Sequence, residues 1–112
     1  MADFTISKMQ EMQKTMHEKH KEVWGGLSPE KAVQKMLWLH GELGEASDVI
    51  KKNGNEKILK DGDVRNRFIE EMCDVLMYFN DVLICYNVTE DELKTAYEKK
   101  VEKNLNRTFN RE

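Results

Sequence analysis

Four carboxylates in the middle of the chain have a spacing that suits metal binding. Glu42 and Glu45 form one pair, Glu71 and Asp74 form another, and the members of each pair are three positions apart in a segment with helical periodicity. Residues at i and i+3 lie on one face of a helix, so each pair brings two negative charges together. Such pairs are unfavourable unless a proton or a cation lies between them. A hard divalent cation that prefers oxygen ligands, Mg2+ or in its place Mn2+, would relieve the repulsion.

Two long helices are expected to position these acids. One is predicted over about residues 29–52, started by Ser28-Pro29-Glu30 and ended by Asn53-Gly54, and the other over about 64–86, capped by Asp63. In both helices the acid pair lies at the edge of the apolar stripe, in the same rotational sense. The stripe of the first consists of Ala32, Met36, Leu39, Leu43, Ala46 and Ile50, and that of the second consists of Phe68, Met72, Val75, Leu76, Phe79, Val82, Leu83 and Tyr86.

The flanking segments predict two further helices. One extends over about residues 5–23, and the other over about 90–106, where Thr89 and Glu92 form a capping box. Residues 53–62 are polar and contain glycine, which indicates a loop with a short turn. The predicted architecture is all-α, with four helices in a single domain over residues 1–112. The apolar side chains expected to face the core are Met9, Met12, Met16 and Val23 in the first helix and Leu93, Tyr97 and Val101 in the last.

Composition narrows the class of protein. Charged residues make up 35% of the 112 residues and the formal net charge is −3, so no basic excess indicates nucleic-acid binding. No apolar run is long enough for membrane insertion or export. Cys73 and Cys85 belong to one predicted helix, where they are too far apart to form a disulfide, and reduced, buried thiols indicate a cytoplasmic protein. A monomer of this size has a thin core, so we expect self-association.

Bound Mg2+ would make a phosphate ester or anhydride the natural substrate, because the ion neutralises phosphate oxygens and activates water. Cationic and polar side chains at helical spacing near the C-terminus would hold the phosphates, with Lys52 as a second source of positive charge. Trp38 or Tyr78 would stack on a base, although either aromatic would also suit core packing. The side chains near the C-terminus are Lys100, Asn104 and Arg107.

Roles other than Mg2+ binding would also suit some of these residues. Either acid pair alone is typical of a solvated helix face with salt bridges to Lys51, Lys52 or Arg67. The parallel placement of both pairs on apolar helices favours the metal. Di-iron chemistry is not indicated, because no histidine follows a glutamate by three residues. A zinc site is not indicated either, and we expect His17 and His20 to be solvent-exposed.

The two acid motifs together resemble those of the MazG-like, all-α nucleoside triphosphate pyrophosphohydrolases. The family pattern is Glu-x-x-Glu, a variable spacer and Glu-x-x-Asp. In this chain Glu42-Leu-Gly-Glu45 is followed by 25 residues and then by Glu71-Met-Cys-Asp74. The segments that carry the resemblance read ELGEASDVIKK from Glu42 and EEMCDVLMY from Glu70. One departure is Gly41, where many relatives have another acid.

The resemblance implies a four-helix MazG-like bundle that forms homodimers or dimers of dimers, with sites completed by both subunits. It implies Mg2+-dependent cleavage between the α and β phosphates of a nucleoside triphosphate, giving a nucleoside monophosphate and pyrophosphate. Glu45 would also orient the attacking water, and Trp38 would line the base pocket. Two alternatives stay open: the same fold acting on phosphoribosyl-ATP or on a pyrimidine nucleotide such as dCTP or dUTP, and a non-catalytic module for oligomerisation or partner binding. The implied metal ligands are Glu42, Glu45, Glu71 and Asp74, and the implied phosphate ligands are Lys100, Asn104 and Arg107.

Overall fold

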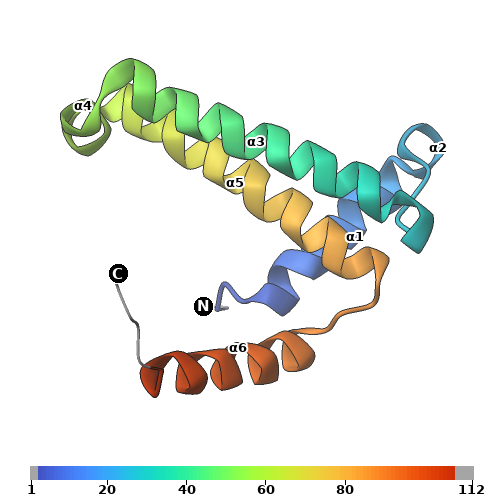
Figure 1. Ribbon diagram of the computed structural model, residues 1–112. Helices are drawn as coiled ribbons and strands as arrows, with labels where there is room; N and C mark the ends of the chain where they lie inside the picture. Colours follow the sequence, from blue (N-terminus) through green and yellow to red (C-terminus); the bar gives the residue numbers. More distant parts are fainter. Residues whose placement is uncertain (1–2, 108–112) are drawn as a thin grey trace.

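The computed structural model describes residues 3–107, and its regular structure is helical throughout this range (Figure 1). The prediction of an all-α protein is therefore confirmed for the described part of the chain. In order, the elements are α1 (Ile6–Lys19), α2 (Lys21–Trp24), a 3-10 turn (Pro29–Lys31), α3 (Ala32–Asn53), α4 (Asn55–Lys60), α5 (Gly62–Cys85) and α6 (Glu90–Leu105).

The centre of the molecule is a hairpin of the two longest helices, α3 and α5, which run antiparallel along most of their length (Figure 1). Helix α3 ends where Gly54 adopts a positive φ of 86°, a conformation that favours glycine. Helix α5 begins after Asp61, whose side chain accepts hydrogen bonds from the backbone N–H groups of Asp63 and Val64. The expected cap was Asp63, so that prediction was two residues late.

The buried residues of α3 follow a spacing of three and four, which is the spacing of a helix pair packed along a narrow seam. This seam includes half of the predicted stripe but excludes Met36, Leu43 and Ile50, which are exposed. On α5, positions such as Val64 and Val82 complete the seam. The predicted stripe was too wide because a single partner helix covers only part of an apolar face. The buried or half-buried seam residues of α3 are Ala32, Lys35, Leu39, Glu42, Ala46 and Val49.

Helix α1 packs across the C-terminal half of α5 and buries polar side chains (Figure 1). Thr5 caps this helix by accepting a hydrogen bond from Lys8 N. The methionines were expected to face the core, but Met12 is exposed, as is Val23 of α2. The buried residues of α1 are instead Gln10, Gln13 and His17. The prediction of an exposed His17 was wrong because its partners come from α5.

Helix α6 does not pack along any other described helix (Figure 1). Its start agrees with the prediction, since both hydrogen bonds of the Thr89–Glu92 capping box are present. Two bonds tie this start to α1: Ser7 N donates to Glu90 Oε1, and Gln10 Nε2 donates to Val88 O. The prediction that Tyr97 and Val101 face a core was wrong for the single chain, because both are exposed.

Residues 3–107 form six α-helices, where the sequence predicted four. Helix α4 occupies the expected loop, and the first predicted helix is divided at His20 into α1 and α2. Cys85 is buried as expected, but Cys73 is exposed because it lies on the side of α5 away from the seam. None of the helices within residues 3–107 combines the length and the apolar character that crossing a membrane requires.

Candidate metal centre and adjoining cavity

Three of the four predicted acids converge midway along the hairpin. Glu42 of α3 and Glu71 and Asp74 of α5 each offer a carboxylate oxygen, and these oxygens lie within 4.8 Å of one another. All three side chains are partly buried. Glu45, one turn after Glu42, is exposed and is not part of this group. The structure therefore assembles a three-carboxylate cluster and leaves Glu45 beside it.

The hairpin explains why these acids meet. Glu42 and Glu71 occupy seam positions of antiparallel helices, so their side chains point toward the opposite helix. Asp74 lies three residues after Glu71 and therefore on the same side of α5. Lys51, Lys52 and Arg67 were considered as salt-bridge partners, but within residues 3–107 they form no ion pair with these acids. The negative charges are thus left without compensation by the basic residues of the hairpin.

Electrostatics around Glu42 reflect this accumulation of charge. Partial burial raises the pKa of Glu42 above its ordinary value of 4.5, and the negative charges of Asp74 and Glu71 raise it further. A side-chain hydrogen bond with Glu71 and the charge of Glu45 act in the same direction. The ionised form of Glu42 is therefore disfavoured until a cation joins the cluster.

The donor set fits Mg2+ better than a softer metal. Carboxylate oxygens are the ligands that Mg2+ prefers, and the ion usually keeps several waters beside one or two carboxylates. Adjacent ligand oxygens of an octahedral Mg2+ lie about 3 Å apart, given metal–oxygen distances of about 2.0–2.1 Å. Oxygens within 4.8 Å can reach this arrangement by small side-chain rotations. No histidine or cysteine of the described chain belongs to the group.

A cavity of about 540 Å3 adjoins the acids, and Glu42 and Asp74 form part of its wall. Trp38, half-exposed, packs edge-on against Tyr78 with ring centroids 5.8 Å apart. The buried Lys35 places its Nζ 4.6 Å from the Trp38 ring centroid. Burial, followed by the charges of Glu42, Asp81 and Asp74, raises the pKa of Tyr78 above 10.0, so its hydroxyl stays protonated at neutral pH. Both aromatics proposed from the sequence thus lie where the cavity meets the acids.

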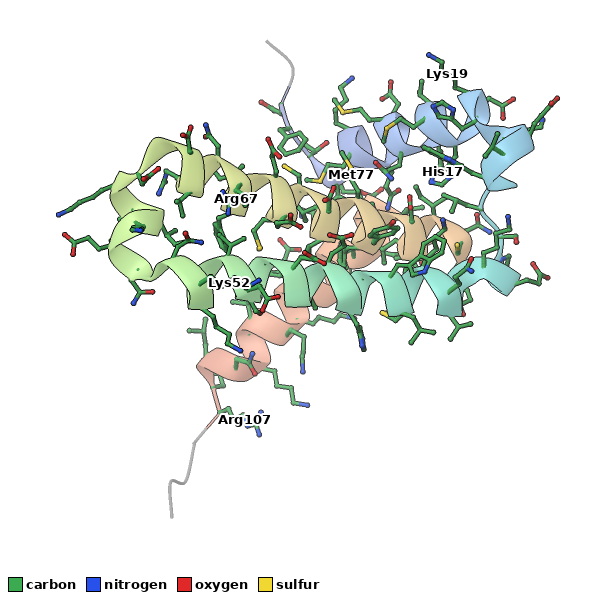
Figure 2. The ribbon with its side chains drawn as sticks, turned by 90° about the horizontal axis from the view of Figure 1, so that it is seen from above. His17, Lys19, Lys52, Arg67, Met77 and Arg107 are labelled. Atoms are coloured by element: carbon green, nitrogen blue, oxygen red, sulfur yellow. The ribbon has the colours of Figure 1, made fainter. Side chains whose placement is uncertain are left out.

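The wall of the cavity away from the acids contains Asp81 with Gln13 and His17, a buried polar group that was not predicted from the sequence. Asp81 Oδ1 accepts a hydrogen bond from Gln13 Nε2 at 2.7 Å and lies 3.2 Å from His17 Nε2. Figure 2 shows His17 on the side of α1 that faces α5, opposite Lys19. One sequence signal existed: Gln10, Gln13 and His17 recur at helical spacing, as the buried face of a helix does.

The other residues predicted to bind substrate are not assembled by the single chain. Lys52 is exposed near the C-terminal end of α3 and does not line the cavity (Figure 2). Lys100 and Asn104 lie on α6, and Arg107 follows that helix at a distance from the hairpin (Figure 2). Since α6 does not pack on the hairpin, the structure does not bring these three residues to the acids.

No protein-family model matches this sequence, and searches of curated proteins and of solved structures find no match either. The comparisons name no family. The function is therefore inferred from the residues of the site and from the resemblance of its two acid motifs.

Replacing Glu42 with glutamine is expected to stabilise the metal-free protein at pH 7. The pKa of Glu42 is raised in the folded state, so its ionisation costs stability as the pH rises through the raised value. The advantage of Glu42→Gln should therefore shrink as the pH is lowered through the raised pKa of Glu42, because the wild-type carboxyl then becomes protonated as well. Urea unfolding with chelator, at pH 7 and at a series of lower pH values, measures the difference. An advantage that is independent of pH would contradict the electrostatic explanation.

Proposed function

We propose that this protein is a Mg2+-dependent nucleoside triphosphate pyrophosphohydrolase that converts a nucleoside or deoxynucleoside triphosphate and water into the monophosphate and pyrophosphate. One observation carries the proposal: the carboxylates of Glu42, Glu71 and Asp74 converge beside a cavity lined by aromatic side chains. The acids suit a metal-bound phosphate chain, and the aromatics suit a base. The motif resemblance points to the same reaction.

In this proposal each wall of the site has a separate role. Glu42, Glu71 and Asp74 would hold Mg2+, which when bound supplies charge neutralisation at the phosphates and activation of water. Glu45 is exposed beside the cluster, where it would orient the attacking water as a general base. The water oxygen would form a bond to the α-phosphorus while its proton passes to Glu45, the α–β anhydride bond would break, and pyrophosphate would leave. Trp38 would stack on the base at the mouth of the cavity.

A second copy of the chain would complete the site, in a homodimer or a dimer of dimers with a MazG-like bundle. The Cα radius of gyration is 17.0 Å, whereas a compact domain of this length has about 13 Å. Helix α6 accounts for part of this excess, since it lies apart from the hairpin (Figure 1). Packed on a partner subunit, α6 would bring Lys100, Asn104 and Arg107 toward that subunit's acids. Lys52 would add charge from α3.

One side of the hairpin supports this assembly, because it is apolar and exposed. Each residue on this side comes one position after a seam residue in the sequence. Because α3 and α5 are antiparallel, the residues one position after the seam face the same side of the helix pair. Trp38, Glu45 and Asp74 precede seam positions and so lie on the opposite side. We call the exposed set the apolar side of the hairpin, and its members are Met36, Leu43, Ile50, Ile69, Met72 and Leu76. Exposed apolar surface of this kind marks an interaction site.

The proposed function is tested by measuring pyrophosphate release from a panel of canonical and modified nucleoside triphosphates, with Mg2+ and with chelator. We expect Mg2+-dependent release of pyrophosphate without orthophosphate. Mn2+ should substitute for Mg2+. Release of orthophosphate alone, or no product from any nucleotide, would refute the proposal and leave phosphoribosyl-ATP hydrolysis or a non-catalytic oligomerisation role. The unpaired thiols Cys73 and Cys85 are consistent with a cytoplasmic setting for this reaction.

A further inference from the structure

Asp81 carries a buried carboxylate whose two oxygens have different surroundings. The residue is 3% exposed, and both of its described hydrogen-bond partners, Gln13 Nε2 and His17 Nε2, meet the same oxygen, Oδ1. A buried carboxylate is costly unless its remaining acceptor capacity is used. Oδ2 is therefore the oxygen left for a molecule inside the cavity that Asp81 lines.

A second buried polar side chain of the same wall also has incomplete hydrogen bonding. His17 is 7% exposed, and its Nδ1 is buried without a hydrogen-bond partner among the described residues. Asp81 and His17 line one continuous cavity with Glu42 and Asp74 of the metal cluster. The cavity thus has an acid cluster that suits phosphates, aromatic walls, and a polar group whose hydrogen bonds are incomplete.

We propose that Asp81 is a specificity-determining residue, which accepts a hydrogen bond from the exocyclic amino group of the substrate's base. This inference rests on the proposed function and narrows it to nucleotides with aminated bases, such as those of cytosine and adenine. The amino groups of these bases are donors, and a carboxylate is a suitable acceptor for them. In uracil a carbonyl oxygen stands in place of the amino group and would face the carboxylate unfavourably.

Uracil offers a ring N–H donor, but this N–H is a poorer hydrogen-bond donor to the Asp81 carboxylate than the amino group of cytosine. Two carbonyl oxygens flank the N–H in uracil, and both would repel an approaching carboxylate. In cytosine the amino group lies beside a ring nitrogen that accepts hydrogen bonds. Lys35, a buried residue of the same cavity, can donate to the ring carbonyl oxygen on the other side of this nitrogen, which cytosine and uracil share. Discrimination between the two bases therefore depends on Asp81.

The hydrogen bonding of Asp81 Oδ1 makes Asp81→Asn an informative substitution. In Asp81→Asn the amide oxygen should occupy the Oδ1 position, because Gln13 Nε2 donates a hydrogen bond there. The amide NH2 then replaces Oδ2 and faces the cavity. The substitution changes no volume, but it converts the acceptor offered to the base into a donor. Preference for an amino group should become preference for a carbonyl group.

Tryptophan fluorescence can report on this cavity directly. The chain has two tryptophans, Trp24 and Trp38, and both line the cavity. Titration with the non-hydrolysable α,β-imido analogues of dCTP and dUTP in the presence of Mg2+ gives a dissociation constant for each base. We expect wild type to bind the dCTP analogue roughly tenfold more tightly, since one good hydrogen bond distinguishes the bases. Asp81→Asn should reverse the order, and the exposed Asp48→Asn should leave it unchanged.

The outcomes separate this inference from the proposed function. Equal binding of both analogues by wild type, or the same preference in Asp81→Asn, would overturn the role of Asp81, as would titrations without any change in fluorescence. Pyrophosphate release without base discrimination would overturn it too and leave the hydrolase proposal standing. Discrimination that reverses in Asp81→Asn, without pyrophosphate release, would support Asp81 and refute the hydrolase. The analogues of dATP and dITP repeat the comparison in wild type for a larger base.

Discussion

Glu71→Ala is expected to abolish pyrophosphate release from nucleoside triphosphates. Glu71 supplies one of the three carboxylates that lie within 4.8 Å of one another, so its removal leaves two ligands for the metal. Loss of one preorganised electrostatic group in an active site typically costs about 100- to 1,000-fold in turnover, and loss of a metal ligand should cost at least that. Pyrophosphate release with saturating Mg2+ measures the effect, and full turnover by Glu71→Ala would refute the metal assignment.

Glu70→Ala provides the matched control, because Glu70 is an exposed acid next to Glu71 on the same helix. Both variants should keep the helix content of wild type in circular dichroism. At a Mg2+ concentration about 100 times its Kd, binding to the folded state alone adds about 2.7 kcal/mol of stability. This stabilisation should be present in wild type and Glu70→Ala but absent from Glu71→Ala. Without metal, Glu71→Ala should melt at a higher temperature than wild type, because one repulsive charge is gone.

Ile50→Asp is expected to dissociate the proposed homo-oligomer. Ile50 lies on the apolar side of the hairpin and is 41% exposed in the single chain. A charge buried at an interface without a partner costs several kcal/mol, so the dissociation constant should rise by at least about 100-fold. Analytical ultracentrifugation over a range of concentrations measures this change. If sites need residues from both subunits, pyrophosphate release should fall in parallel at concentrations where the variant is monomeric.

Leu59→Asp serves as the control for this experiment. Like Ile50, Leu59 is an exposed aliphatic residue, but it belongs to α4 at the end of the hairpin and not to the apolar side of the hairpin. Its substitution adds the same charge and should leave self-association unchanged. A wild-type protein that stays monomeric at every concentration would contradict the assembly, and so would an Ile50→Asp variant that associates like wild type.

The elements that sequence predicted well are those governed by local interactions. The Thr89–Glu92 capping box starts α6 as predicted, because its hydrogen bonds join residues three apart. Gly54 ends α3 as predicted, because only glycine adopts its positive φ readily. The two acid pairs fell on the two longest helices for the same local reason. The sequence did not predict which apolar residues form the seam, because apolar periodicity does not tell which part of a wide stripe a single neighbouring helix will cover.

Contacts between distant segments decided the rest of the site. Gln13 and His17 meet Asp81 across 68 and 64 positions of sequence, and no local pattern pairs them. Hydrophobicity predicted burial of the methionines of α1, but the polar, hydrogen-bonded face of α1 is the one that packs against α5. The sequence itself determined an all-α chain with two acid motifs on paired helices. Only the tertiary structure decided that Glu42, Glu71 and Asp74 converge while Glu45 stays outside, because convergence depends on how two helices are rotated against each other.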